Sequence, residues 1–167
     1  EAPVSHIRLD SRQVEPGDLF VPLLGERVDS HRFLPQVMDQ GAAAVLTSQE
    51  LTLPEGGAGC AVIRVEDTKK ALQKIGSYLR DRLTLPLVGV TGSVGKTTTR
   101  EMIAAALSAR FRVYKTPGNS NSQVGVPVTL SEITENDQVG VIELGMSEPG
   151  EMTVIANIAR VDMAVIT

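Results

Sequence analysis

One stretch near the middle of the chain decides the fold; it reads Leu87-Val88-Gly89-Val90-Thr91-Gly92-Ser93-Val94-Gly95-Lys96-Thr97-Thr98. Its first four residues are typical of a short strand that is buried on both faces of a parallel sheet. The glycines that follow allow a tight turn in which successive backbone N–H groups converge on an anion. A helix is expected from Lys96 to about Arg110, and its positive end points at the same place. The stretch therefore predicts a strand, a phosphate-binding loop and a helix.

The side chains of this loop suit a nucleotide and its metal ion. Lys96 supplies a positive charge for the β- and γ-phosphates, and the hydroxyl of Thr97 can ligate Mg²⁺. The strict pattern has glycine five residues before Gly95, where this chain has Val90. An ordinary strand–turn–helix junction with an exposed lysine is the alternative, but the flanking strand and helix favour a phosphate loop. The residues expected to bind ATP are Thr91, Gly92, Ser93, Val94, Gly95, Lys96, Thr97 and Thr98.

Outward from the loop, short apolar runs alternate with helical patterns. Further strands are expected at 111–115, 139–144 and 162–166, with a helix between the last two, which is the pattern of a parallel sheet. Glu143 lies near the carboxyl end of its strand, and ligands bind outside the carboxyl ends of such sheets. We therefore expect Glu143 to reach a metal ion on the phosphates, although a solvated glutamate at a strand end is the alternative.

A polar segment follows the strand at 111–115 and so lies at the same edge of the sheet. It reads Thr116-Pro117-Gly118-Asn119-Ser120-Asn121-Ser122-Gln123. The uncharged donors and acceptors of Asn119 and Asn121 suit recognition of a sugar, an amide or a phosphate. A simple turn explains the same composition equally well, because glycine and asparagine are favoured in turns.

The N-terminal part predicts a separate, smaller α/β domain. Strands are expected at 7–9, 19–21, 42–46 and 61–65, helices at about 32–40 and 67–83, and a loop at 54–59. On the second helix one face is expected to be buried; it consists of Ala71, Leu72, Ile75, Tyr78 and Leu79. Pro86 disfavours helix at the residue before it, which places the boundary there. The fold class is therefore α/β, with a small N-terminal domain (1–84) and part of a phosphate-loop parallel-sheet domain (85–167).

Composition excludes several classes of protein. The chain has 167 residues, a net charge of −4 and 42% hydrophobic residues, which suits a folded protein without general affinity for nucleic acid or anionic membranes. The single cysteine, Cys60, excludes an internal disulfide and a zinc–thiolate cluster. No apolar run approaches the roughly 20 residues that span a bilayer, and no signal peptide opens the chain. A cytoplasmic protein is expected.

Three segments together resemble the Mur ligase family of bacterial cell-wall enzymes; they are 90–99, 117–127 and 143–151. The middle segment, Gly-Asn-x-Asn followed by Gly-Val-Pro, looks most like the member that adds D-alanyl-D-alanine to UDP-N-acetylmuramoyl-tripeptide. Near the N-terminus, Asp10-Ser11-Arg12, 16–20 and 29–33 resemble the first domain of the family, which holds the uridine end of the substrate.

The resemblance implies an ATP-dependent, ADP-forming amide ligase of peptidoglycan precursor synthesis that works through an acyl phosphate, with links to cell shape and cell division. It implies ATP and Mg²⁺ as cofactors, UDP-N-acetylmuramoyl-tripeptide and D-alanyl-D-alanine as partners, no nucleic acid or membrane partner, and a monomeric parent. Lys96 and Glu143 would be catalytic, and Thr97 and Glu143 would hold Mg²⁺. Substrate would be bound by Asp10, Ser11, Arg12, Asn119 and Asn121.

The chain stops at Thr167, as its last expected strand ends. We therefore expect an N-terminal fragment that is inactive alone, because the family also has a histidine metal ligand, a carbamylated lysine and a C-terminal domain. The alternatives are another Mur-type or folylpolyglutamate-type ligase, cyanophycin synthetase, or a non-catalytic nucleotide-binding module. A GTPase or kinase would need a base-reading motif, which the sequence does not show.

Overall fold

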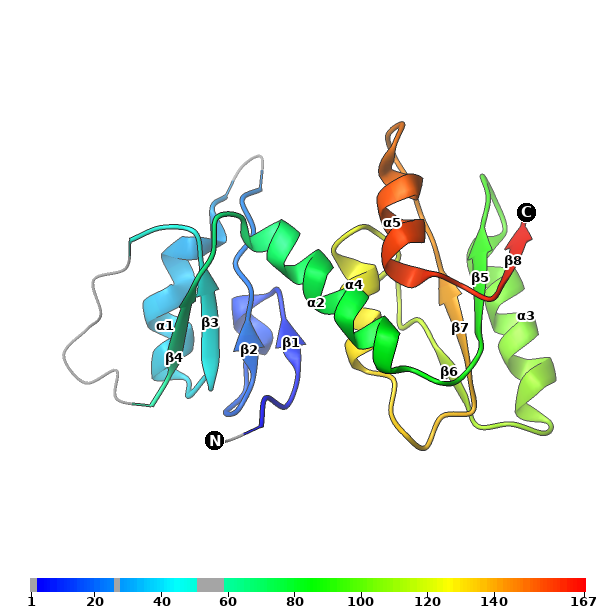
Figure 1. The fold of residues 1–167 in the computed structure, drawn as a ribbon, viewed down its shortest axis with the longest axis horizontal. Coiled ribbons are helices and arrows are strands. Elements are labelled where there is room, and N and C mark those ends of the chain that lie inside the picture. Colours follow the sequence, from blue (N-terminus) through cyan, green and yellow to red (C-terminus); the bar gives the residue numbers. More distant parts are fainter. Residues whose placement is uncertain (1–2, 26–27, 51–58) are drawn as a thin grey trace. The chain divides into compact units, whose positions relative to one another are not determined.

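The computed structural model describes residues 3–25, 28–50 and 59–167, and it divides the chain into two compact units, residues 1–72 and 73–167. The division falls inside helix α2 (Thr68–Arg82), before the boundary at 84 that the sequence predicts. The loop expected at 54–59 lies outside the described residues except for Gly59. Figure 1 shows the order of the elements along the chain.

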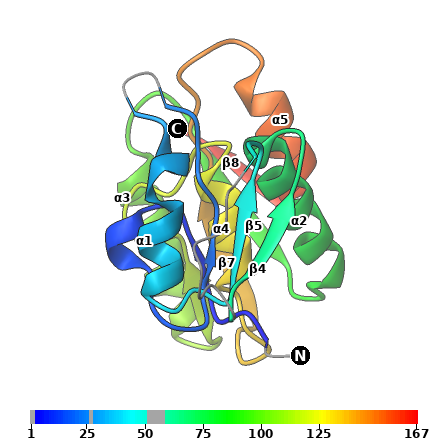
Figure 2. The same cartoon turned by 90° about the vertical axis from the view of Figure 1, so that its left-hand side faces the viewer.

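The first unit is built on a parallel sheet of four strands in the order β1-β2-β3-β4. The strands are β1 (Ile7–Arg8), β2 (Leu19–Phe20), β3 (Ala44–Thr47) and β4 (Ala61–Arg64). Helix α1 (Leu34–Asp39) and the 3-10 helices η1 (Ser11–Gln13) and η2 (Ser30–Phe33) complete it. In Figure 2 this unit faces the viewer, with α1 lying along the strands. Its core joins Phe20 and Val45 of the sheet to Leu34 and Val37 of α1, all nearly inaccessible to solvent.

The second unit holds a parallel sheet in the order β6-β7-β5-β8. Its strands are β5 (Leu87–Thr91), β6 (Val113–Lys115), β7 (Val139–Glu143) and β8 (Met163–Ile166). The central strand β5 pairs with β7 on one side and β8 on the other. Every residue of β7 is buried, as expected for a strand inside a parallel sheet with both faces covered. The predicted α/β class and parallel sheets are confirmed.

Helices cover both faces of this second sheet (Figure 1). Val90 and Val141 pack with Ala104 of α3 (Lys96–Ser108) on one face. On the other, Leu87 and Ile142 join a larger cluster with α4 (Gly125–Ser131) and α5 (Glu151–Ala159). Because side chains alternate along a strand, neighbouring residues of β7 serve opposite faces. No helix in the described ranges is long and apolar enough to cross a membrane.

Two features of the helices differ from the expectations. Helix α4 is not expected from the sequence, because its seven residues include Gly125 and Pro127, which have low helix propensity; burial of Val126 and Leu130 compensates. The prediction that Tyr78 is buried is wrong, since it is 58% exposed. Its hydroxyl accepts a hydrogen bond from Arg82 (2.6 Å), and the guanidinium lies over its ring. At Gly76 instead, a Cβ would lie 2.8 Å from that of Pro127, so α2 meets α4 there.

Candidate active site

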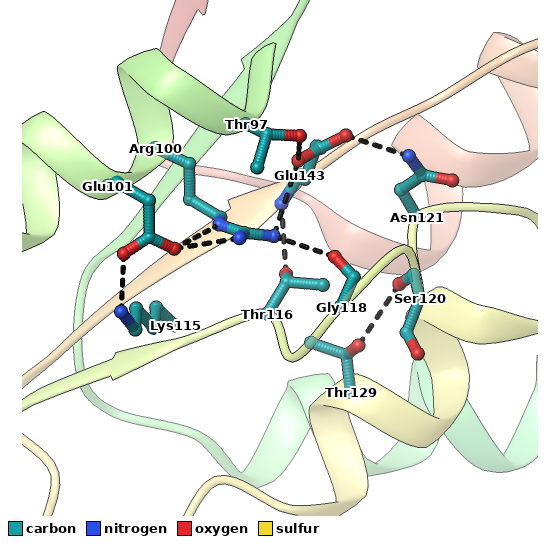
Figure 3. A network of polar contacts seen from close by, with 10 residues as sticks. All are labelled: Thr97, Arg100, Glu101, Lys115, Thr116, Gly118, Ser120, Asn121, Thr129 and Glu143. Carbon is teal, nitrogen blue, oxygen red and sulfur yellow. Dashed lines mark hydrogen bonds and ion pairs between the residues drawn. The ribbon is translucent and has the colours of Figure 1, made fainter.

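The strand register brings three segments to one edge of the second sheet. Val90 of β5 is the register partner of Glu143 at the end of β7, and Lys115 of β6 is the partner of Val141. The phosphate loop that follows β5, the carboxylate of Glu143 and the segment that follows β6 therefore meet, as the sequence predicts. Figure 3 shows the polar contacts that join them.

The phosphate loop requires glycine at two positions. Gly92 and Gly95 have φ angles of +139° and +83°, in the region that side chains rarely adopt. Gly95 precedes the first residue of α3, so the turn into the helix depends on it. The ammonium of Lys96 donates a hydrogen bond to the carbonyl of Gly92 (2.8 Å). The lysine therefore lies across its own loop, where the backbone and the helix N-terminus favour an anion.

Glu143 is held on both oxygens of its carboxylate, although it is only 2% exposed. Oε2 accepts hydrogen bonds from the hydroxyl of Thr97 (3.0 Å) and from Nη1 of Arg100 (3.3 Å). Oε1 accepts one from the side-chain amide of Asn121 (2.8 Å). Its own backbone N–H donates to the hydroxyl of Thr116 (2.9 Å). A buried carboxylate with this many hydrogen-bond donors is fixed in direction.

Thr97 and Glu143 form a donor set that fits Mg²⁺. The Thr97 hydroxyl donates a hydrogen bond to Glu143, so the lone pairs of the Thr97 oxygen remain available to a cation. Hydroxyl and carboxylate oxygens are the ligands that Mg²⁺ prefers, and the ion usually completes its shell with phosphates and water. Residues 3–25, 28–50 and 59–167 hold no group of three or more His, Cys, Asp or Glu placed to bind a metal. Because Thr97 and Glu143 offer two adjacent ligand oxygens, this edge suits a metal ion that arrives with a phosphate ligand.

Arg100 is a member of this network that the sequence analysis missed. Its guanidinium also donates to the carbonyl of Gly118 (3.0 Å) and to Glu101 (2.7 Å), and Lys115 pairs with Glu101. The hydrogen bonds from Lys115 and Arg100 lower the pKa of Glu101 below its usual value. Arg100 follows Thr97 by one helical turn, and residues three apart share a face of a helix. That spacing is the signal that places Arg100 beside the expected metal ligands.

The two asparagines that the sequence predicts for substrate lie in different surroundings. Asn121 is half-buried, and its side chain faces Glu143; its backbone carbonyl accepts a hydrogen bond from the N–H of Gly145 (2.8 Å). A Cβ on Gly145 would lie 2.8 Å from Cγ of Asn121, so glycine makes room for this amide. Asn119 is exposed. Asn121 thus orients the carboxylate, and only Asn119 presents an open side chain; substrate binding by either stays a prediction.

In the first unit, the predicted substrate residues Asp10, Ser11 and Arg12 lie together at η1. Asp10 caps this short helix by accepting the backbone N–H of Arg12 (3.0 Å), and it also binds the Arg12 guanidinium (2.6 Å). The side-chain hydrogen bonds from Arg12 lower the pKa of Asp10 to about 2. Ser11 is buried. The exposed group here is therefore the Arg12 guanidinium, already paired with a carboxylate.

Comparison with known proteins identifies related domains over nearly the whole chain. Residues 3–79 match the Mur ligase family, catalytic domain, and residues 90–167 match the Mur ligase middle domain. The chain is 43% identical to the UDP-N-acetylmuramoyl-tripeptide–D-alanyl-D-alanine ligase of Bacillus subtilis, over 96% of this chain and 35% of that protein. It thus spans about a third of the length of this relative.

Solved structures agree with this relationship. A crystal structure of MurF from Acinetobacter baumannii matches with a TM-score of 0.89 and 36% identity, covering 98% of this chain and 35% of that one. The MurF ligase of Thermotoga maritima, solved in complex with ADP, matches with a TM-score of 0.80 and 31% identity, over 93% and 35% of the two chains. The resemblance noted in the sequence is confirmed: the chain belongs to the Mur ligase family and carries its N-terminal and middle domains.

Proposed function

We propose that the protein that carries this chain is an ATP-dependent ligase that joins D-alanyl-D-alanine to UDP-N-acetylmuramoyl-tripeptide. The observation that carries the proposal is the contact between Thr97, at the start of the phosphate-loop helix, and the buried carboxylate of Glu143. The relative in Bacillus subtilis is named a UDP-N-acetylmuramoyl-tripeptide–D-alanyl-D-alanine ligase, and the Thermotoga maritima enzyme was solved with ADP; both support these substrates. A cytoplasmic monomer is part of the same proposal.

The reaction needs two anions to meet, and the residues at this edge suit that task. The terminal carboxylate of the tripeptide attacks the γ-phosphorus of ATP, and the bond to the β-γ bridging oxygen breaks, which gives an acyl phosphate and ADP. The amine of D-alanyl-D-alanine then attacks the acyl carbon, loses a proton and displaces phosphate. Lys96 stabilises the transferring phosphoryl group by its charge, and the loop from Thr91 to Thr98 holds the nucleotide.

Thr97 and Glu143 would hold Mg²⁺, which screens the negative charges of the phosphates when it is bound. Their side chains are already joined by a hydrogen bond, and Arg100 and Asn121 hold Glu143 from other sides. Little reorganisation is then needed when the nucleotide arrives. Preorganised groups of this kind lower the barrier because their orientation has been fixed during folding.

Substrate recognition is proposed for two places, one in each unit. In the first unit, Asp10, Ser11 and Arg12 bind the nucleotide end of UDP-N-acetylmuramoyl-tripeptide, since the planar fork of Arg12 matches a phosphate. In the second unit, the phosphate loop, Glu143 and the loop after β6 meet at one edge of the sheet, which we call the phosphate edge. Asn119 and Asn121 lie on its substrate side. Because Asn119 is exposed and Asn121 is half-buried, the structure supports substrate binding by Asn119 more than by Asn121.

The test is an assay of ADP release by the full product of the gene that encodes this chain. We expect ADP only when UDP-N-acetylmuramoyl-tripeptide and D-alanyl-D-alanine are both present, and loss of turnover in Lys96→Met. Arg110→Met, a change in an exposed cation just after the same helix, is the matched control and should leave turnover unchanged. ADP release with a different amine, such as a single amino acid, would favour another Mur-type ligase. Nucleotide binding without any turnover would favour a non-catalytic module.

A further inference from the structure

We propose that Arg100 is a positioning residue that assembles the metal carboxylate and the loop after β6 into one unit before the nucleotide binds. The inference rests on the proposed function, because it assigns Glu143 to Mg²⁺. Arg100 itself would touch neither nucleotide nor substrate. It would act through the two groups that its guanidinium holds, the carboxylate of Glu143 and the carbonyl of Gly118.

The guanidinium of Arg100 contacts two segments that are far apart in the sequence. One nitrogen, Nη1, donates both to Oε2 of Glu143 (3.3 Å) and to the carbonyl of Gly118 (3.0 Å). These acceptors belong to different segments, the end of β7 and the loop after β6, while Arg100 comes from α3. A single side chain therefore joins α3, the end of β7 and the loop after β6, as Figure 3 shows.

The ion pair between Arg100 and Glu143 is buried. The side chains of Arg100 and Glu143 are 5% and 3% exposed, so the contact between them is enclosed by the fold. Because the pair is buried, water does not compete for these hydrogen bonds, and the direction of the carboxylate is set by Arg100 together with its other protein donors. Arg100 thus helps to hold Glu143 in one orientation while no metal ion is present. The carboxylate is then already aimed when Mg²⁺ arrives.

The shape of the guanidinium adds to this positioning. Nη1 serves Glu143 and Gly118, while Nε and Nη2 both donate to Glu101, whose other oxygen is bound by Lys115. The plane of the guanidinium is therefore fixed from two sides. The single ammonium of a lysine has no such plane and offers its donors from one point. We expect lysine at this position to keep the charge but to lose part of the orientation.

The experiment measures the Mg²⁺ dependence of nucleotide binding in the full gene product, with a fluorescent, non-hydrolysable ATP analogue. In Arg100→Met, the Mg²⁺ concentration for half-maximal binding should rise roughly tenfold to a hundredfold, the usual effect of losing a residue that orients a metal ligand. Arg100→Lys should show a smaller rise. Analogue binding in the absence of Mg²⁺ should be the same in all variants.

A second readout separates positioning from a general loss of structure. Saturating Mg²⁺ should restore most of the lost kcat in Arg100→Lys, whereas damage to the fold would not respond to Mg²⁺. Arg110→Met, an exposed arginine just after the end of α3, is the matched control and should bind the analogue with the Mg²⁺ dependence of the parent protein. Where Arg100→Met does not fold, Arg100→Lys alone carries the test.

The outcomes distinguish the two proposals. If the parent protein binds the analogue in a Mg²⁺-dependent way and both Arg100 variants match it, Arg100 does not position the metal carboxylate. If both variants lose kcat and added Mg²⁺ has no effect, the role of Arg100 is structural only. If the parent protein itself shows no Mg²⁺-dependent nucleotide binding, the proposed ligase function fails first.

Discussion

Two carboxylates of this chain pair with an arginine at a predicted ligand site, and their surroundings are opposite. Glu143 and Arg100 lie 3.3 Å apart with side chains 3% and 5% exposed. Asp10 and Arg12 lie closer, at 2.6 Å, but their side chains are 33% and 84% exposed. The shorter pair is therefore the one that water screens, and the longer pair is the one that the fold encloses.

This comparison teaches that burial and the number of partners, more than distance, decide how firmly a charge is held. Water competes for both members of the Asp10–Arg12 pair, so its contribution to stability is small. Glu143 cannot exchange its donors for water without opening the edge of the sheet. The polar network in the second unit is thus assembled in advance, whereas the Arg12 guanidinium is held only by an exposed pair that water and other ligands can compete with.

The strongest way to break the comparison is to remove the buried carboxylate. Glu143→Ala leaves Arg100 paired with Glu101 alone and removes the acceptor of Thr97 and Asn121, and we expect a loss of about 3–5 kcal/mol in the stability of the second unit. Hydrogen exchange of the Val141 amide in the centre of β7 measures this locally. Glu148→Ala, the same change at an exposed position, is the control and should have little effect. A loss as small as that of the control would show that the buried pair is not held as described.

A smaller effect is expected where the enclosed site is overfilled. Gly145→Ala places a methyl group 2.8 Å from Cγ of Asn121, which must move away from Glu143. We expect a loss of about 1–3 kcal/mol, as for other overpacked positions, measured by urea unfolding. Gly59→Ala is a suitable control, because a Cβ there meets nothing within 4 Å. Equal unfolding midpoints for the two variants would contradict the close approach of Asn121.

Substitutions at Gly118, in the loop after β6, measure the effect of backbone conformation without side-chain crowding. Gly118 has a φ angle of +52°, and a Cβ at this position would meet nothing within 4 Å. Gly118→Ala should therefore cost about 1 kcal/mol from the left-handed conformation only, and Gly118→Asn should cost less, because asparagine tolerates that region better. The measurement is the difference between the two variants in urea unfolding. Alanine as stable as asparagine would mean that the carbonyl of Gly118 is not fixed by this conformation.

The exposed pair should respond least in stability but clearly in titration. Arg12→Ala should leave the unfolding midpoint unchanged, while the pKa of Asp10 returns from about 2 toward 3.8, because the hydrogen bonds from Arg12 are the main cause of its low value. Because the pKa of Asp10 is lower in the folded than in the unfolded chain, its ionised form stabilises the fold at any pH above the unfolded pKa. This small contribution is lost as pH falls from about 4 toward 2. Nuclear magnetic resonance of the Asp10 carboxyl carbon measures the titration. If the pKa of Asp10 in Arg12→Ala stays at the low value of the parent protein, Arg12 does not hold Asp10 in solution.

The phosphate loop and Glu143 could be predicted because each is marked by its place at the end of an apolar strand. The spacing from Thr97 could have placed Arg100 on the same face of its helix. Its contact with Glu143 and that of Asn121 could not be predicted, since they depend on the register between β5, β6 and β7, which are far apart in sequence. The residue type of Asn121 predicts a polar contact but does not identify the partner, which in the structure is Glu143. Tyr78 was placed wrongly because helical periodicity gives a face, whereas the packing of Gly76 on Pro127 decides which part of that face is covered.

The strand order β6-β7-β5-β8 has a consequence for how the protein is made on the ribosome. The strand that carries the phosphate loop, β5, is synthesised first, yet its ladder partners are β7 and β8, which emerge later. At usual rates of translation, β5 waits on the order of seconds with its backbone groups unpaired by a neighbouring strand. Thr97 likewise acquires its partner only when Glu143 has been added. The nascent chain therefore gains a complete phosphate edge in one late event, when β7 inserts between β5 and β6.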